Sequence, residues 1–336
     1  MLILSSIESK LKTGLLAGFF ILLQACVSAP QTELLLGQAP AIPVAYEIEN
    51  VAFFPQKDFF CGPTTLAELL NYYGIDIEPD QVAPMLFIPG LEGSLQIEMA
   101  SSIRQYGLLA YVDQGGVEQG NLLQLLSLIS DGLPVIVLQN LGTTWYPVWH
   151  YALVIGYDLK REKVILHTGT TERRNAPMDL FESTWRKGQF WMLVAVPPER
   201  SSAYFNSFLY INAAQDLVRV GQKDAATKAL ETATSQWADY WLSYFLLGNY
   251  YLSEDPSLAL YWYKKGLEFG AEVPSYLNNY AYALLFNGCE DQAVDSIRKA
   301  LAIEPDNSTL LDSLADIQEQ FNEQAKPIKQ NHSCSS

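Results

Sequence analysis

The sequence predicts an α+β domain followed by an all-α repeat domain, and two observations carry this prediction. In residues 51–198 helical patterns come first and short β-branched runs follow, which is typical of an α+β domain with an antiparallel sheet. In residues 206–310 every pattern is helical and the spacing of small residues repeats. A chain of 336 residues is long enough for two separate cores.

Composition and charge exclude several classes of protein. Apolar residues make up 49% of the chain and charged residues 17%, which describes a globular protein. The net charge of −16, without a basic patch, excludes a nucleic-acid-binding protein. No Cys-x-x-Cys pair or Cys/His cluster has the spacing of metal ligands, so we expect neither a metal nor another cofactor.

The N-terminus reads as a targeting signal. Two lysines precede an apolar run at 15–23, which is too short to span a bilayer but suits a signal peptide. The run ends in Leu23-Gln24-Ala25-Cys26, which resembles a bacterial lipobox, whose cysteine becomes lipidated. An ordinary signal peptide is the alternative. We therefore expect residues 1–25 to be a lipoprotein signal peptide and Cys26 to anchor the protein in the cell envelope, facing the periplasm. The resemblance to Gram-negative lipoproteins implies that Val27, in place of Asp, is compatible with transfer to the outer membrane.

Residues 26–50 contain three prolines and few apolar faces, which predicts a tether. Beyond it, helices are expected from Cys61 onward, around 95–106 and over 122–130, and strands over 134–138, 151–157, 163–167 and 190–196. Pro197-Pro198 marks the end of the first domain. From residue 324 the chain is polar, and we expect a disordered tail over 324–336.

The second half has a repeat of 34 residues, seen in Ala225, Ala259 and Ala293 and again in Gly266 and Ala300. Small residues recur where two helices approach closely. The pattern resembles the tetratricopeptide repeat, in about three copies, and an ordinary helical bundle is the alternative. Such repeats form concave surfaces suited to peptides and helices, so the resemblance implies a protein partner.

Cys61 is the candidate nucleophile. It lies in Phe59-Phe60-Cys61-Gly62-Pro63-Thr64-Thr65, and a helical pattern follows at once. The positive end of a helix dipole and unpaired backbone N–H groups stabilise a thiolate, which predicts a lowered pKa and a reactive sulfur. The alternative is a buried structural cysteine.

A base and an oxyanion donor are also present. Of the three histidines, His332 lies in the tail, which leaves His150 and His167; His150 opens an apolar strand and is the better candidate for general base. Gln56 can offer its amide to an oxyanion, with the backbone N–H of Cys61 as the second donor. A hydrogen-bonded core histidine and a loop glutamine without a role are the respective alternatives.

Together, Gln56, the Cys61-Gly62-Pro63-Thr64-Thr65 segment and His150-Tyr151-Ala152-Leu153-Val154 resemble the bacteriocin-processing peptidase family. Its founding members are papain-like cysteine peptidases that cleave leader peptides after a double glycine. The resemblance covers roughly residues 50–198. It implies a papain-like fold, thiol peptidase chemistry and no metal.

The family usually orients the histidine with an aspartate on the following strand. Here that stretch reads Val164-Ile165-Leu166-His167-Thr168-Gly169 and has no carboxylate. Thr168 can accept a hydrogen bond from the ring, His167 is a substitute, and Asp158 is a remote candidate. Loss of the orienting group weakens a triad without abolishing it.

Three aromatic residues, Trp145, Tyr146 and Trp149, precede His150 and are assigned to the core rather than to a substrate groove. The sequence thus predicts a membrane-anchored cysteine peptidase that cleaves a peptide or protein, with repeats that recruit a protein partner. Two alternatives stay open. One is acyl transfer or amide hydrolysis on a non-protein target such as a cell-wall peptide, and the other is a catalytically weak adaptor.

Overall fold

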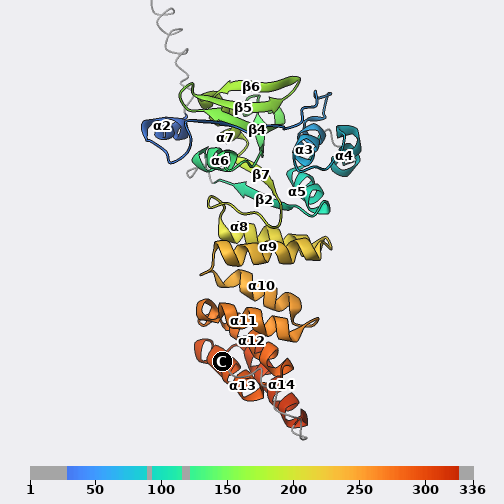
Figure 1. The fold of residues 1–336 in the computed structure, drawn as a ribbon, viewed down its shortest axis with the longest axis vertical. Coiled ribbons are helices and arrows are strands. Elements are labelled where there is room, and N and C mark those ends of the chain that lie inside the picture. Colours follow the sequence, from blue (N-terminus) through green and yellow to red (C-terminus); the bar gives the residue numbers. More distant parts are fainter. Residues whose placement is uncertain (1–28, 89–92, 116–121, 325–336) are drawn as a thin grey trace, which may run out of the picture.

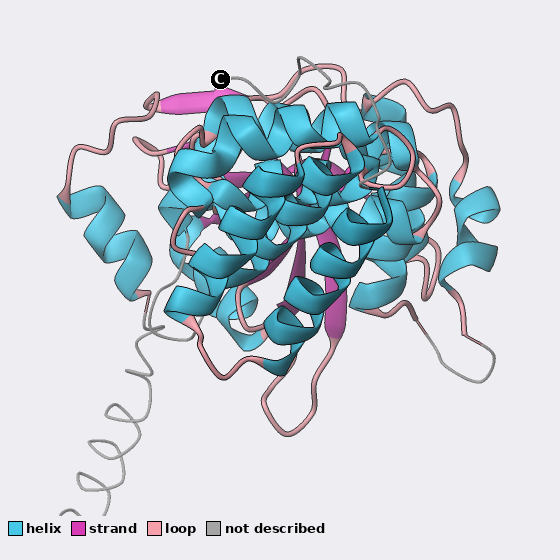
Figure 2. Cartoon of the chain, turned by 90° about the horizontal axis from the view of Figure 1, so that it is seen from below, coloured by secondary structure: helices cyan, strands magenta, loops and turns pink. Residues whose placement is uncertain are grey.

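The computed structural model describes residues 29–88, 93–115 and 122–324, in two parts stacked along the long axis of the molecule (Figure 1). The first part surrounds a β-sheet, and the second is a column of helices that Figure 2 shows from its free end. Within these ranges no helix combines the length and the apolar character that a membrane crossing requires. Cys26, His332 and the predicted signal peptide lie outside the described residues.

The sheet is antiparallel throughout and has the strand order β2-β7-β3-β4-β5-β6. A further short strand, β1, pairs with the C-terminal half of β4. The strands are β1 (Ala45–Glu47), β2 (Leu109–Gln114), β3 (Val135–Asn140), β4 (Trp149–Asp158), β5 (Lys163–Thr168), β6 (Thr171–Pro177) and β7 (Trp191–Val196). The predicted antiparallel α+β domain is confirmed.

Helices cover both faces of the sheet. On β3, Val135 and Val137 belong to one core cluster, while Ile136 and Leu138 belong to the other. Because successive side chains of a strand point to opposite faces, β3 is buried along its whole length. One face is covered by α3 (Cys61–Tyr72), α4 (Pro79–Leu86) and α5 (Gln96–Gln105), the other by α2 (Pro30–Gly37), α6 (Leu122–Ser130) and α7 (Met178–Lys187).

The prediction of a tether over residues 26–50 is wrong for its described part. Residues 30–37 form α2, and residues 45–47 form β1, which extends the sheet at β4. The buried carboxylate of Glu182 on α7 accepts hydrogen bonds from the backbone N–H groups of Gln31 (3.2 Å) and Thr32 (2.7 Å). This long-range cap satisfies donors that a free helix start leaves exposed, so the segment docks on the domain.

The helical part contains three helix pairs and one final helix. The pairs are α8 (Ser207–Arg219) with α9 (Lys223–Gln236), α10 (Trp241–Tyr251) with α11 (Pro256–Gly270), and α12 (Pro274–Phe286) with α13 (Glu290–Ile303). The final helix, α14 (Ser308–Gln324), lies mostly beyond the predicted boundary at 310. Glycines make the close helix contacts possible. A Cβ added at Gly266 would lie 2.5 Å from the Cβ of Tyr244.

The helical part packs directly on the sheet instead of hanging from a linker. The ring of Phe205 lies 4.4 Å from that of Tyr111 on β2, and the Tyr111 hydroxyl accepts the backbone N–H of Asn206 (3.1 Å). Arg104 of α5 forms a salt bridge with Asp216 of α8 (2.7 Å). The hydrophobic core therefore continues from the sheet into the first helix pair.

We expect Gly266→Ala to lower the free energy of unfolding by about 1–3 kcal/mol, because the new methyl group would press on Tyr244 and on the Tyr276 hydroxyl, 2.6 Å away. Urea denaturation followed by circular dichroism measures this. Gly37→Ala is the matched control, because a Cβ there meets no atom within 4 Å. Equal stability of the two variants would show that the helices of the second part do not need this close approach.

Candidate active site

Cys61 is the first residue of α3, and its sulfur interacts with the backbone N–H of Tyr151 on β4. The turn before it contains Phe59 in the left-handed region, with φ of 63°, a strained conformation for a large side chain. Gly62 follows because a Cβ at this position would collide with the side chain of Ser94. The local sequence therefore serves to bring the start of α3 against the segment around Ser94, with Cys61 half-buried between them.

Two opposing effects act on the thiol of Cys61. The backbone N–H groups of Tyr151, Gly62 and Cys61 itself lower its pKa, as expected at a helix start. Burial is the larger effect, and it raises the pKa above the ordinary value of a cysteine because a thiolate loses its hydration there. The prediction of a lowered pKa is therefore wrong, and the resting residue is a neutral thiol.

His150 is held by Thr168. The second residue of β4 places its imidazole Nε2 2.7 Å from the hydroxyl oxygen of Thr168 at the end of β5. The sulfur of Cys61 interacts with the backbone N–H of Tyr151, the residue after His150, so Cys61 lies beside the strand segment that carries His150. Burial, followed by the charge of Arg174, lowers the pKa of His150, so its imidazole is neutral at pH 7.

This arrangement can support general-base chemistry. When Nε2 carries the hydrogen, Thr168 accepts it, and Nδ1 keeps a lone pair that can take the proton of Cys61. A hydroxyl group has no charge, so it orients the ring but stabilises an imidazolium less than a carboxylate does. The raised pKa of Cys61 favours the neutral thiol, and the lowered pKa of His150 favours the neutral imidazole.

The two other candidates for the orienting residue face elsewhere. His167 is buried with its Nδ1 3.6 Å from the carboxylate of Glu68. Asp158 lies eight residues beyond His150 on β4, about 26 Å away along a strand. Its carboxylate accepts the backbone N–H of Arg161. Of the three residues considered from the sequence, Thr168 alone contacts His150 within the described part of the chain.

Gln56 lies beside this cluster. Its backbone N–H donates to the carbonyl of Gly169 (2.9 Å), the residue after Thr168, and its side chain is partly exposed. The loop before α3 is thereby fixed to the turn between β5 and β6. The role of the Gln56 amide as an oxyanion donor stays a prediction.

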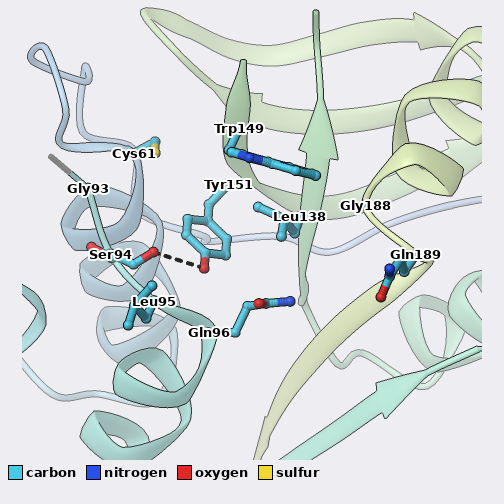
Figure 3. A pocket seen from close by; sticks show the side chains of 10 residues that line it. All are labelled: Cys61, Gly93, Ser94, Leu95, Gln96, Leu138, Trp149, Tyr151, Gly188 and Gln189. Carbon is cyan, nitrogen blue, oxygen red and sulfur yellow. Dashed lines mark hydrogen bonds between the residues drawn. The ribbon is translucent and has the colours of Figure 1, made fainter. Parts of the chain in front are cut away.

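A cavity of about 450 Å³ opens beside Cys61 (Figure 3). Tyr151 stands in it and donates a hydrogen bond from its hydroxyl to the carbonyl of Ser94 (3.2 Å). The volume suits side chains of a bound peptide or a small molecule. The lining residues are Cys61, Gly93, Ser94, Leu95, Gln96, Leu138, Trp149, Tyr151, Gly188 and Gln189.

Sequence reasoning missed most of this lining, including the polar residues Ser94, Gln96 and Gln189. They come from segments that are distant in the sequence, and no local pattern marks them. A group of three or more potential metal ligands is absent from the residues that the structure describes.

The aromatic residues before His150 are exposed, and their assignment to the core is wrong. Trp145 is 86% exposed, Tyr146 70% and Trp149 53%. Their loop, residues 141–148, is nevertheless ordered, because the side-chain oxygen of Asn140 accepts the backbone N–H groups of Gly142 and Val148, both at 2.9 Å. Trp149 also lines the cavity beside Cys61. A fixed, exposed apolar surface next to a cavity is typical of a binding site.

Residues 48–190 match the model of the family described as Peptidase_C39 like family. A comparison with curated protein sequences finds no match. Among solved structures, the chain is similar to a putative C39-like peptidase from Bacillus anthracis, with 20% identity and a TM-score of 0.37, covering 47% of this chain and 99% of that chain.

It is also similar to a double glycine motif protease from an AMS/PCAT transporter, solved with its leader peptide. The identity is 18% and the TM-score 0.34, with 47% of this chain and 98% of that chain covered. A third similarity is to the MamA protein, with 14% identity and a TM-score of 0.32, covering 35% of this chain and 64% of that chain. The matched residues, 48–190, are followed in this chain by the helix pairs of the second part.

We expect the rate of Cys61 alkylation by iodoacetamide to keep rising above pH 9, because its pKa is raised and the thiolate is the reacting form. In His150→Ala the profile should keep its shape, since a neutral imidazole stabilises no thiolate. Mass spectrometry of the Cys61 peptide measures the rate. A plateau reached near pH 6 in the wild type, and lost in His150→Ala, would instead establish a resting ion pair.

Thr168→Asp tests the missing carboxylate. A carboxylate next to Nε2 should raise the pKa of His150, and the resulting imidazolium should favour the Cys61 thiolate. We expect alkylation at pH 7 to accelerate about tenfold for each unit by which the thiol pKa falls. Thr168→Asn, which places a neutral amide there, is the control. Equal rates in the Asp and Asn variants would contradict this role of position 168.

Proposed function

We propose that the protein is a cysteine peptidase in which the thiol of Cys61 attacks a peptide carbonyl. His150 takes the thiol proton as general base and returns it to the leaving amine, and Thr168 holds the imidazole in the required tautomer. Charge that develops on the carbonyl oxygen is met by the backbone N–H of Cys61 and the side-chain amide of Gln56. The acyl-enzyme is then released by water.

The observation that carries this proposal is that the half-buried thiol of Cys61 lies next to the strand segment of His150, whose imidazole is oriented by Thr168. Cys61 opens α3 at a cavity, its sulfur contacts the N–H of Tyr151, and the preceding residue, His150, is hydrogen-bonded to Thr168. The Peptidase_C39-like match supports the same chemistry. A structural cysteine has no need of an adjacent cavity or of an oriented imidazole.

The apolar lining of the cavity beside Cys61 favours a peptide with apolar side chains as the substrate. Leu138, Trp149 and Tyr151 line the cavity, and Trp145 and Tyr146 are exposed in the loop that leads into β4. A peptide whose scissile carbonyl lies at Cys61 can place neighbouring side chains on this surface, with little ordering cost because the loop is already fixed.

The remaining parts of the proposal concern location and partners. Cys26 is the proposed lipid anchor in the bacterial envelope, and the lipobox-like sequence that ends at this residue supports it. The proposed location is the outer membrane, which Val27 supports. The helix pairs are proposed to recruit a protein partner or substrate. A leader peptide with a double glycine is not part of the proposal, because the leader peptide in the complex of the double glycine motif protease is a ligand of that protein.

A catalytically weak adaptor is the second candidate function, and a specific observation favours it. The orienting residue is a neutral threonine, and burial raises the pKa of Cys61, so the resting site lacks the ion pair of a strongly activated thiol. In this case the protein acts through its helix pairs, and the cleft binds peptides without cleaving them.

Digestion of a proteome-derived peptide library, followed by mass spectrometry of new termini, separates the two functions. For a peptidase we expect cleavage next to apolar residues, abolished in Cys61→Ala and reduced about 10²–10⁴-fold in His150→Ala. Trp145→Ala should raise KM with little change in kcat, because Trp145 is proposed to contact bound substrate and not the reacting atoms.

Gly37→Ala serves as the control for handling and folding, because it lies on α2, away from the cavity. Cleavage that persists in Cys61→Ala would sink the peptidase proposal. Peptide binding without any cleavage by the wild type, measured by fluorescence anisotropy, would establish the adaptor.

A further inference from the structure

A buried acid and a buried histidine lie beneath the candidate active site and take no part in the chemistry proposed above. Glu68 is on α3, two helical turns after Cys61, and His167 is on β5, immediately before Thr168. Each residue is 1% exposed, and Nδ1 of His167 lies 3.6 Å from Oε2 of Glu68. Neither of these two atoms has a hydrogen-bond partner within the described residues.

The same pair also holds the loop that carries Gln56. The other carboxylate oxygen of Glu68 accepts the backbone N–H of Phe54 at 3.0 Å. The ring of Phe53 packs edge-on against the imidazole of His167, with 5.2 Å between ring centroids. Two residues further along the loop, the N–H of Gln56 donates to the carbonyl of Gly169.

Three separate segments therefore meet at Glu68 and His167. One is α3, which begins with the nucleophile; the second is the end of β5, which holds the base; the third is the loop 53–56, which carries the proposed oxyanion donor. Strand β4 with His150 joins them through its pairing with β5, in which Leu153 faces His167. The distances among Cys61, His150 and Gln56 thus depend on how firmly these segments are joined.

An apolar residue would fill this position at lower cost. A buried carboxylate loses hydration, which raises the pKa of Glu68, and the N–H of Phe54 and His167 offset this only in part. Leucine would avoid that cost but leave the buried N–H of Phe54 without a partner. A hydrogen-bond acceptor at position 68 therefore fixes the loop at Phe54, which an apolar side chain of similar size cannot do.

We propose that Glu68 and His167 are positioning residues of the candidate active site, a brace that sets α3 and the loop 53–56 at fixed distances from Thr168. Its consequence for cleavage rests on the proposed peptidase function. Its geometric effect does not, because the state of the Cys61 thiol and of the His150 imidazole is measurable without any substrate.

Glu68→Leu and Glu68→Gln test the brace. Glutamine can still accept the N–H of Phe54, so we expect nearly unchanged behaviour, whereas leucine cannot. In Glu68→Leu, iodoacetamide should alkylate Cys61 about tenfold more slowly at pH 8, which corresponds to a rise of one pKa unit as the backbone donors at the sulfur move away. The ¹⁵N resonances of the His150 imidazole should change from one fixed tautomer to an average of two.

Glu182 supplies matched controls in the same domain. It is also fully buried and also accepts backbone N–H groups, but it lies on α7 and holds α2 on the opposite face of the sheet. Glu182→Leu should lower the melting temperature, because it leaves the backbone N–H groups of Gln31 and Thr32 without their acceptor, yet it should leave the Cys61 alkylation profile and the His150 resonances as in the wild type, as should Glu182→Gln.

His167→Phe keeps the proposal testable if Glu68→Leu does not fold. Phenylalanine preserves the packing on Phe53 but leaves the buried Glu68 carboxylate without the imidazole that partly offsets its burial, so we expect the same slower alkylation and the same averaging at His150. The brace is overturned if these variants and the Glu182 variants give the same alkylation rates and the same His150 spectra. That result is independent of peptide cleavage, so it is distinct from a failure of the peptidase proposal.

Discussion

The burial of helix α3 against the sheet is the interaction on which the rest of the structure depends. Every residue from Gly62 to Leu70 is buried, and Leu66, Leu69 and Leu70 have no exposed surface. Each such leucine stabilises the fold by about 1.5–3 kcal/mol. The same packing fixes where the helix begins, and so where Cys61 lies. It also requires a glycine at position 62, because any side chain there meets Ser94.

Burial also decides the state of the sulfur. A helix N-terminus stabilises a negative charge by at most about 2 kcal/mol in partly buried sites. Removing an anion from water costs several kcal/mol. The second effect is larger at Cys61, which explains why its pKa is raised although three backbone N–H groups point toward it. The proposed peptidase chemistry therefore requires a base that acts on a neutral thiol, and a neutral Thr168 is compatible with such a base.

The contact between the sheet and the helical part has a functional consequence within the proposals made above. Phe205 and Tyr111 belong to one continuous core, and Arg104 and Asp216 join α5 to α8 across the boundary. A partner held by the helix pairs would therefore stand at a fixed position relative to Cys61. Recruitment of this kind raises the local concentration of a substrate only if the geometry lets it reach the cleft.

Patterns local in the sequence determined the classes of structure and the chemistry-bearing residues. Helical and β-branched periodicity predicted the α+β domain, the spacing of small residues predicted the helix pairs, and the helix start at Cys61 predicted a nucleophile. Thr168 was predicted from the resemblance to the bacteriocin-processing peptidase family, because the stretch after His150 lacks the aspartate that the family usually has there. These features depend on neighbours along the chain, so the sequence displays them.

Tertiary structure alone decided the rest, because burial and long-range contacts are not written in local patterns. Residues 30–50 read as a tether since their partners, Glu182 and β4, are distant in sequence. Trp145 and Tyr146 read as core, because composition does not reveal which side of a hairpin faces water. The raised pKa of Cys61 and the pairing of Glu68 with His167 likewise follow from the burial of α3. How deeply a helix is buried depends on the whole folded chain.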